Sequence, residues 1–414
     1  MTLREAEDYL LGLELFGMRF GLDRMHKLMT ALGIPQRRYA SIHVVGSNGK
    51  SSTVRFIAAL LEGHGLRTGS YTSPHLASFR ERIEIGGVPT SGENFGAAVA
   101  RAKHAAEMVE RTLADDDGVT QFEALTAAAF HELAARGVEV AVIEAGLGGR
   151  YDATNVIPSR VQVLTGVGLE HTRWLGPTVS HIAEEKLAVV RHNATLVVGE
   201  LPDEVMALAQ RTARERGANL VEGPDDVLVP PLRAAGSFQR RNFALACAAG
   251  EAFLDRPLDQ EAVRSAATET LVPGRLEAVG SDPLTLYDGA HNPAGAQALA
   301  GAVPEVIGHR HPLVLVLSVL EDKDAAGMLE ALLPMADSVV FTRCQNPRSL
   351  SPATLASLAA KVADVRGETV ARPRAAVARA RELAGPGGAV LATGSIYLIA
   401  DLVREEGGAR ASAL

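Results

Sequence analysis

A short apolar segment at residues 41–45 runs directly into a glycine-rich sequence, G-S-N-G-K, at residues 46–50. Residues 53–64 then carry apolar side chains at helical spacing. A strand, a glycine-rich turn and a helix in immediate succession are the opening of a βαβ unit. The backbone N–H groups of such a turn and the N-terminus of the next helix together form a pocket for phosphate oxygens. This segment therefore favours an α/β fold built around a parallel sheet.

The same alternation of strand and helix continues beyond this turn. Further strands are predicted at residues 67–71, 138–144, 161–167 and 195–198, and helices at residues 3–33, 91–113 and 122–136. Strands that alternate with helices favour a parallel sheet with helices on both of its faces. A ligand is then expected at the edge where the carboxyl ends of the strands meet.

A second alternating series follows a break at residues 273–275, whose sequence is P-G-R. Its strands are predicted at residues 284–288, 312–320, 338–342 and 388–393, and its helices at residues 293–303 and 325–335. A chain of 414 residues is too long for one ordinary core, so two or three domains are expected. We therefore predict an N-terminal P-loop-type parallel-sheet ATPase domain at residues 1–272 and a smaller C-terminal Rossmann-like α/β domain at residues 273–414.

The composition excludes several classes of protein. With 47% hydrophobic residues, 22% charged residues and a net charge of −8, the chain is globular and is not expected to bind nucleic acid. No apolar run reaches the roughly 18 residues that a membrane span needs, and residues 1–8 lack signal-peptide character. The only two cysteines, Cys247 and Cys344, argue against a disulfide framework. A cytoplasmic protein without a membrane partner is expected.

The glycine-rich turn carries the first candidate binding residues. Lys50 would reach the β- and γ-phosphates of a nucleotide, and Ser51 or Ser52 would face a magnesium ion. Only six of the 41 basic residues are lysine, which favours a specific use for Lys50. The strict phosphate-loop pattern has a glycine where this chain has Val44, so a plain turn between strand and helix stays an alternative.

Two further polar groups follow predicted strands of the first domain. Glu144 ends the apolar segment 138–144 and precedes A-G-L-G-G, whose glycines allow a ligand to approach the backbone. Magnesium prefers a few hard oxygen ligands, so a carboxylate suits this position, and an ion pair with an arginine is the alternative. His171 also follows a strand, but a histidine in such a place is more often only hydrogen-bonded.

The remaining candidates lie in one helix of the first domain and in loops of the second. Lys186 follows A-E-E, and by itself this pattern indicates a solvated helix face. Residues 287–293 (Y-D-G-A-H-N-P) form a dense polar loop between a strand and a helix that starts with proline, which favours a binding site over a simple turn. Residues 321–324 and 393–397 are polar loops at the same edge, and each could by itself be a solvated turn.

In this order, the motifs resemble the Mur ligase superfamily, and its folylpolyglutamate synthase/dihydrofolate synthase branch fits best. The resemblance covers nearly the whole chain and rests on residues 46–50, 71–76 (Y-T-S-P-H-L), 144–150 (E-A-G-L-G-G-R), 152–155 (D-A-T-N), 273–275, 288–293, 322–324 and 393–395. Residues 72–83 match a segment specific to the folate branch, where it forms a loop near the pterin site. The intact run at residues 149–155 looks like that of the bifunctional enzymes.

The resemblance implies a role for each matching residue. The ATP contacts would be Asn48, Gly49, Lys50, Ser51, Ser52, Asn242, Arg275 and Asp288. Two Mg²⁺ ions are implied, with Ser73, Glu144 and His171 as ligands and with Lys186 at the position of a lysine that is often carbamylated. The pterin would lie near Phe79, Arg82, Phe122, Asp152 and Ala153, and the incoming glutamate near His291, Ser395 and Tyr397. Lys50, Lys186 and His291 would be the catalytic residues.

The resemblance thus implies a monomeric ATP-dependent ligase that adds L-glutamate to dihydropteroate, to reduced folates or to both, through an acyl phosphate. One alternative is a Mur-type ligase with a non-folate acceptor, which the start of the chain close to the ligase helix disfavours. A phosphate-loop ATPase and a non-catalytic folate-binding relative are the others. Ser47, Ser51, Glu170 and Leu187 depart from the family pattern and bear on metal geometry and substrate choice.

Overall fold

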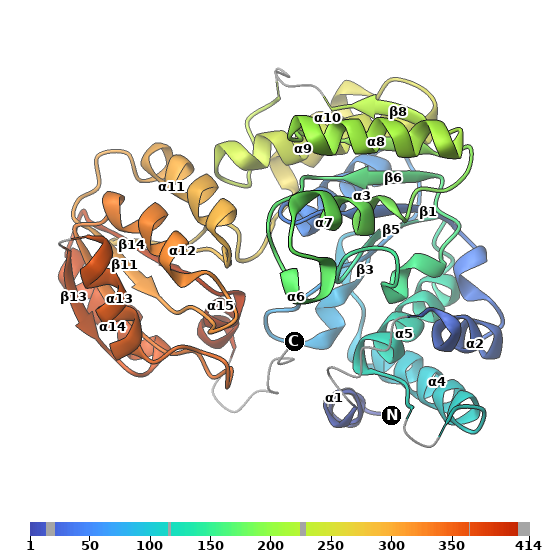
Figure 1. Cartoon of the computed structure of the whole chain (residues 1–414), viewed down its shortest axis with the longest axis horizontal. Helices are drawn as coiled ribbons and strands as arrows, with labels where there is room; N and C mark the ends of the chain where they lie inside the picture. The colour runs from blue at the N-terminus through green and yellow to red at the C-terminus, as the bar shows by residue number, and fades with distance from the viewer. Residues whose placement is uncertain (14–20, 115–116, 224–228, 364, 405–414) are drawn as a thin grey trace. The chain divides into compact units, whose positions relative to one another are not determined.

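The computed structural model describes residues 1–13, 21–114, 117–223, 229–363 and 365–404 (Figure 1). The chain divides into two compact units. One comprises residues 1–232 and 241–270, and the other comprises residues 233–240 and 271–413. The assignment of nucleotide binding to residues 1–272 and of glutamate binding to residues 273–414 stays a prediction.

The described part of the N-terminal unit is built on an eight-stranded sheet of order β4-β3-β2-β5-β1-β6-β7-β8. Its strands are β1 (Ala40–Val45), β2 (Thr68–Tyr71), β3 (Ile83–Ile85), β4 (Val88–Pro89), β5 (Val140–Glu144), β6 (Val161–Leu164), β7 (Thr195–Val198) and β8 (Asn219–Glu222). Six neighbouring strands run parallel, in the order β2, β5, β1, β6, β7 and β8. β3 and β4 extend one edge as antiparallel strands. The inner strands β1 and β5 are buried from Ser41 to Val45 and from Val140 to Glu144, because both faces of the sheet are covered.

The parallel pairing brings the candidate loops to one edge of this sheet. Val44 of β1 pairs with Glu144 of β5, and Val45 pairs with Leu164 of β6. The glycine-rich turn after β1, the carboxylate at the end of β5 and the loop after β6 therefore lie next to one another. Open parallel sheets bind their ligands at this edge.

Helices cover both faces of the sheet. They are α1 (Leu3–Gly12), α2 (Asp23–Ala31), α3 (Lys50–Gly63), α4 (Gly92–Glu110), α5 (Gln121–Ala135), α6 (Thr172–Leu175), α7 (Val179–Leu187), α8 (Asp203–Arg216), α10 (Gln260–Glu269) and most of α9 (Ser237–Leu254), with 3-10 turns η1 (Pro35–Arg37), η2 (Phe79–Arg82) and η3 (Ala153–Val156). α3 packs on β1, β2 and β5, whereas α1, α2, α4 and α5 contact one another and form a helical layer of their own (Figure 1). This helical layer shares a core with Tyr71 of β2 and Ile143 of β5.

The prediction of one helix at residues 3–33 is wrong. α1 ends at Gly12 and α2 begins at Asp23, while residues 14–20 lie outside the described part of the chain. Leu13 has extended backbone after α1, and Gly21 has a φ of 147°, which no helix contains. Both helices bury an apolar stripe in the same core, so the apolar spacing of the sequence did not reveal the break.

The described part of the second unit contains a six-stranded sheet of order β13-β12-β11-β14-β10-β9, in which only β9 is antiparallel. Its elements are β9 (Glu277–Ser281), β10 (Leu284–Tyr287), α11 (Pro293–Ile307), β11 (Leu313–Leu317), α12 (Ala325–Leu332), η4 (Leu333–Met335), β12 (Ser338–Phe341), α13 (Pro352–Val362), β13 (Arg366–Thr369), α14 (Pro373–Ala384), β14 (Ala389–Thr393) and α15 (Ile396–Val403). α14 contacts β11, β12 and β14, and side chains of α11, α12 and α13 share a core with β11 and β14.

The predicted fold class, two α/β units with largely parallel sheets, is confirmed. The predicted strand at residues 195–198 coincides with β7, and the predicted segments 138–144 and 388–393 contain β5 and β14. None of the helices in the described ranges is long and apolar enough to cross a membrane.

Candidate active site

The glycine-rich turn after β1 is held in one conformation by its neighbours. Gly46 and Gly49 have φ values of 151° and 84°, which favour glycine. A side chain on Gly46 would overlap the hydroxyl of Thr165, and a side chain on Gly49 would overlap the amide of Asn242. Thr165 also donates a hydrogen bond of 2.6 Å to the Asn48 carbonyl. The turn is thus fixed, with the N-terminus of α3 directly behind it, as a phosphate pocket requires.

Two of the six lysines meet at this turn. The Lys50 Nζ donates to the carbonyl oxygens of Gly46, at 2.9 Å, and Ser47, at 3.3 Å. The Lys186 Nζ, from α7, donates to the same Gly46 carbonyl at 2.9 Å. The sequence pattern around Lys186 indicated a solvated helix face, but its side chain is only 2% exposed. The structure therefore places two positive charges against the candidate phosphate site.

Lys186 is paired with Glu170, a residue that departs from the family pattern. The Lys186 Nζ lies 2.8 Å from the Glu170 Oε1, and the side chain of Glu170 is 7% exposed. Burial alone would raise the pKa of Glu170, but the ammonium groups of Lys186 and Lys50 lower it well below its usual range. Burial lowers the pKa of Lys186, although Glu170 opposes this effect. This pair links the loop after β6 to the phosphate turn through the Gly46 carbonyl.

Glu144 is the centre of the candidate magnesium site. Its buried carboxylate accepts a hydrogen bond from the Ser51 hydroxyl at 3.1 Å and one from the Ser73 backbone N–H at 3.1 Å. His171 follows β6 and precedes α6, with a φ of 47°. Among the residues that the structure describes, no three His, Cys, Asp or Glu side chains form a ready metal site. Such a sparse ligand set is one that magnesium accepts, because it keeps waters and phosphate oxygens as further ligands.

The predicted pterin residues Phe122, Asp152 and Ala153 lie around the loop that follows β5. The half-buried ring of Phe122 lies so close to Gly146 that a side chain there would overlap it. The Asp152 carboxylate accepts hydrogen bonds from the backbone of Leu147, at 2.8 Å, and from the backbone and hydroxyl of Thr154. Burial raises the pKa of Asp152. Ala153 is buried beside it at the start of η3.

Behind Asp152 lies a buried histidine that the sequence analysis did not select. The His43 Nε2 is 2.8 Å from the Thr154 hydroxyl, which donates its only hydrogen to Asp152. This network assigns the proton of His43 to Nε2, while the buried Nδ1 has no hydrogen-bond partner among the described residues. Burial lowers the pKa of His43 to about 3, and the positive charge of Arg191 adds to this effect.

The low pKa of His43 predicts that the protein loses stability on mild acidification. Between pH 6.5 and about 3 the unfolded chain binds a proton that the folded chain excludes, so the free energy of unfolding falls as the pH falls. The loss approaches about 1.4 kcal/mol per pH unit once the unfolded histidine is charged. Urea unfolding at pH 7.5, 6.5 and 5.5 should show a smaller loss for His43→Gln than for the wild type. The exposed-site variant His309→Gln should keep the wild-type slope, and equal slopes for all three proteins would contradict the prediction.

Phe79 and Arg82, also predicted as pterin contacts, are both 1% exposed in η2. The Arg82 guanidinium lies 5.5 Å from the centre of the Phe79 ring, and its Nε donates to the His75 Nδ1 at 3.0 Å. The His75 and Phe79 rings are 4.3 Å apart. These three side chains pack together under the segment that follows β2.

The polar loop after β10 is organised by Asp288. One carboxylate oxygen accepts from the Leu276 N–H at 2.8 Å and the other from the Ala290 N–H at 2.7 Å. Burial raises the pKa of Asp288, and the positive charge of Arg275 opposes this. The Arg275 guanidinium lies directly against Gly289, where a side chain would overlap it. Asp288 therefore joins the start of the second unit to the loop and leaves Arg275 beside that loop.

The predicted glutamate contacts lie at the ends of β10 and β14, which are parallel neighbours. His291 Nδ1 is 3.0 Å from the Gly289 carbonyl. Ser395 caps α15 by accepting a hydrogen bond from the Tyr397 N–H at 3.2 Å, and both residues are buried. The structure thus brings His291, Ser395 and Tyr397 to one edge of the second sheet, at adjacent strand ends.

Comparison with known proteins identifies the class of protein to which this chain belongs. Residues 274–396 match the family described as Mur ligase, glutamate ligase domain. A "Dihydrofolate synthase/folylpolyglutamate synthase" of Mycobacterium tuberculosis is 37% identical over 81% of this chain and 76% of that protein. A Bacillus subtilis protein with the same description is 31% identical over 96% of this chain and 98% of its own length. The class is that of the Mur-type ligases, and the chain belongs to the dihydrofolate synthase/folylpolyglutamate synthase family.

Solved structures of this family have the same fold. Folylpolyglutamate synthase of Mycobacterium tuberculosis with ADP has a TM-score of 0.89, 34% identity and 97% coverage of both chains. Escherichia coli FolC with DHPP and ADP has a TM-score of 0.85, 27% identity and 97% coverage of both chains. A Yersinia pestis bifunctional folylpolyglutamate synthase/dihydrofolate synthase with AMPPNP and a manganese ion has a TM-score of 0.84, 29% identity and 97% coverage of both chains.

Proposed function

We propose that this protein is an ATP-dependent ligase that adds L-glutamate to dihydropteroate, to reduced folates or to both, through an acyl phosphate. The observation that carries the proposal is the meeting of Lys50, Lys186 and Glu144 at the carboxyl edge of the N-terminal sheet, beside a fixed glycine turn. Membership of the family, and relatives solved with ADP or with DHPP, support the choice of substrates. By the family resemblance, the protein acts as a cytoplasmic monomer.

The N-terminal unit binds the ATP phosphates. The amides of Asn48 and Gly49 and the first turn of α3, with Ser51 and Ser52, surround the position of a phosphate group. Lys50 now donates to two carbonyl oxygens of the turn, which holds its ammonium over the pocket. When a nucleotide is bound, this ammonium stabilises the charge that develops on the transferred phosphoryl group.

Ser73, Glu144 and His171 would hold a magnesium ion. The fit rests on Glu144, a buried carboxylate whose two oxygens accept hydrogen bonds from the Ser51 hydroxyl and from the Ser73 backbone N–H. A magnesium ion there would neutralise phosphate charge, and the manganese ion in a related structure supports a divalent cation. Without it, Glu144 would bring a negative charge close to the phosphates, which would oppose binding.

A second magnesium ion depends on the state of Lys186. Burial lowers its pKa, which favours the neutral amine that reacts with CO₂ to give a carbamate and a released proton. This reaction would replace the ion pair with Glu170 by two neighbouring carboxylates, which need a cation between them. Carbamylation of Lys186 and a second magnesium ion are therefore gained or lost together.

The acceptor lies against the loop after β5. Phe122 of α5 packs against Gly146 of this loop and contacts the pterin, and the Asp152 carboxylate, next to the buried Ala153, supplies the polar group. Phe79 and Arg82 are buried, so they shape the neighbouring segment from within. In the second unit, His291, Ser395 and Tyr397 bind the incoming glutamate, and Arg275 and Asp288 are the predicted nucleotide contacts of that unit. In the N-terminal unit, the predicted nucleotide contact Asn242 lies against Gly49 of the glycine-rich turn.

The reaction then needs two displacements. The acceptor carboxylate attacks the γ-phosphorus of ATP and releases ADP, and the resulting acyl phosphate is attacked at carbon by the α-amine of glutamate, which releases phosphate. Lys50 positions the phosphoryl group in the first step. Acyl phosphates hydrolyse, so the site must exclude water during the second step.

Phosphate release from MgATP tests this function. Release should require L-glutamate together with 7,8-dihydropteroate or tetrahydrofolate, and the better acceptor identifies the preferred reaction. Release that requires neither substrate would instead favour a phosphate-loop ATPase. Release with another carboxylate acceptor would favour a Mur-type ligase of different specificity, and no release at all would favour a non-catalytic relative.

A further inference from the structure

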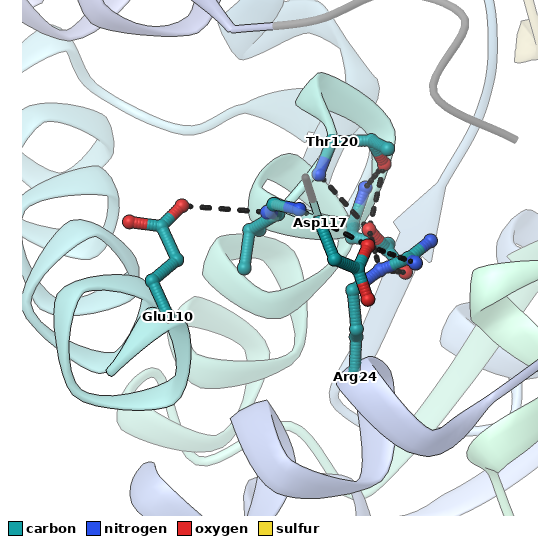
Figure 2. Close-up of polar contacts among 7 residues, drawn as sticks. Arg24, Glu110, Asp117 and Thr120 are labelled. Carbon is teal, nitrogen blue, oxygen red and sulfur yellow. Dashed lines mark hydrogen bonds and ion pairs between the residues drawn. The ribbon is translucent and has the colours of Figure 1, made fainter. Parts of the chain in front are cut away.

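The helical layer contains a cluster of charged residues that no predicted role uses (Figure 2). Arg24, at the start of α2, is buried with 7% exposure. Its Nε lies 3.0 and 3.1 Å from the two carboxylate oxygens of Glu123, and its Nη1 lies 2.8 Å from the Asp117 Oδ1. A buried guanidinium that contacts two carboxylates in this way is held in one position and holds its partners in turn.

The two carboxylates that Arg24 contacts lie in the connection between α4 and α5, at Asp117, and in the first turn of α5, at Glu123. Asp117 accepts a hydrogen bond from the Gly118 N–H at 3.0 Å, and Glu110 of α4 accepts one from the Val119 N–H at 3.3 Å. The Thr120 N–H donates to Glu123 at 2.9 Å. Three consecutive backbone groups are thus bound to carboxylates, as Figure 2 shows, so the connection has a defined conformation directly before α5.

Glu123 also forms the first turn of α5. Thr120 caps the helix by accepting a bond from the Glu123 N–H, while the Glu123 carboxylate accepts from the backbone and hydroxyl of Thr120. This capping box encloses Phe122, the second residue of the helix. The position of Arg24 therefore sets the position of the turn that carries Phe122.

From this turn, Phe122 packs against the loop after β5, which carries the predicted pterin contact Asp152. Its ring centre is 6.3 Å from that of Tyr71, and the ring lies against the backbone of Gly146. Gly146 in turn precedes Leu147, whose N–H binds Asp152. A small rotation of the first turn of α5 would thus move the Phe122 ring relative to the Asp152 carboxylate.

We infer that Arg24 is a positioning residue for the acceptor, because its contacts with Glu123 and Asp117 hold the turn that presents Phe122 to the pterin. The inference rests on the proposed function, since it takes Phe122 as a wall of the pterin site. Arg24 lies on α2, and none of the predicted nucleotide contacts belongs to this helix. Loss of Arg24 therefore raises KM for the pterin acceptor and leaves KM for ATP unchanged.

The test compares Arg24→Met and Arg24→Lys with two controls on the same helix. Lys27→Met removes a cation that contacts Thr112 of the same connection but not the first turn of α5. Leu28→Ala removes core packing and shows what a loss of Tm alone does. Arg24→Met should raise KM for 7,8-dihydropteroate about tenfold, and Arg24→Lys by less, with KM for ATP within about twofold of the wild type. Both controls should keep the wild-type KM for the acceptor.

A double variant with Phe122 distinguishes a positioning role of Arg24 from a general contribution to stability. If Arg24 acts through this ring, Arg24→Met should raise KM for dihydropteroate much less in a Phe122→Leu background than in the wild type. Additive effects, or an Arg24→Met variant that loses only Tm as Leu28→Ala does, would overturn the inference. A wild-type protein that uses no pterin acceptor would instead overturn the proposed function. The two failures are distinguishable because the second appears before any variant is made.

Discussion

Lys50→Ala should abolish glutamate- and pterin-dependent phosphate release, with a loss of about 10³-fold in kcat. The ammonium of Lys50 is fixed over the glycine turn by two carbonyl oxygens, at 2.9 and 3.3 Å, so its charge is placed before the nucleotide arrives. A preorganised charge of this kind acts mainly on the transition state of phosphoryl transfer. Phosphate release at saturating MgATP, glutamate and dihydropteroate measures the effect.

The folded structure should tolerate this substitution, because Lys50 is only partly buried and its partners are backbone carbonyls. Tm should therefore stay close to the wild-type value. Lys103→Ala, which removes a lysine from α4, is the matched control and should keep full activity. If Lys50→Ala retained more than about a tenth of the wild-type rate, the assignment of the glycine turn to the phosphates would be wrong.

The parts of the fold that were predictable from sequence are those governed by local pattern. Buried parallel strands are short apolar runs between turns, and this marks β5, β7 and β14 without any knowledge of tertiary structure. Because parallel strands end at one edge, the residues that follow them, such as Glu144 and Asp288, could be recognised as site candidates. The prediction of a single helix at residues 3–33 failed because two successive helices that bury apolar residues in the same core show the same helical spacing of apolar residues.

The contacts that were not predictable join residues far apart in sequence. Arg24 and Glu123 are 99 residues apart, and Lys186 and Gly46 are 140 residues apart. An arginine or lysine on a helix carries no local sign of whether its partner is water or a buried carboxylate. One signal was present, since residues 120–123 (T-Q-F-E) have the pattern of a capping box and mark the start of α5. That pattern places Phe122 on the first turn, but it does not reveal Arg24.

The largest effect on stability is expected at the pair of Glu170 and Lys186. In protein freed of magnesium and bicarbonate, Glu170→Gln leaves the buried Lys186 ammonium without its carboxylate, and Lys186→Met leaves Glu170 without its cation. Removing one partner of a buried ion pair costs roughly 3–5 kcal/mol of stability. The cost is smaller here, because an unpaired Glu170 can take up a proton and an unpaired Lys186 can release one. Urea unfolding at pH 7.5 should show a marked loss of stability for both single variants.

The double variant Glu170→Gln with Lys186→Met separates stability from function. Removing both charges at once leaves no unpaired buried ion, so its free energy of unfolding should exceed that of either single variant. Its ligase activity should stay as low as that of Lys186→Met, because the Lys186 amino group at the Gly46 carbonyl, or the carbamate formed on it, is gone. A Glu170→Gln protein as stable as the wild type would contradict the ion pair.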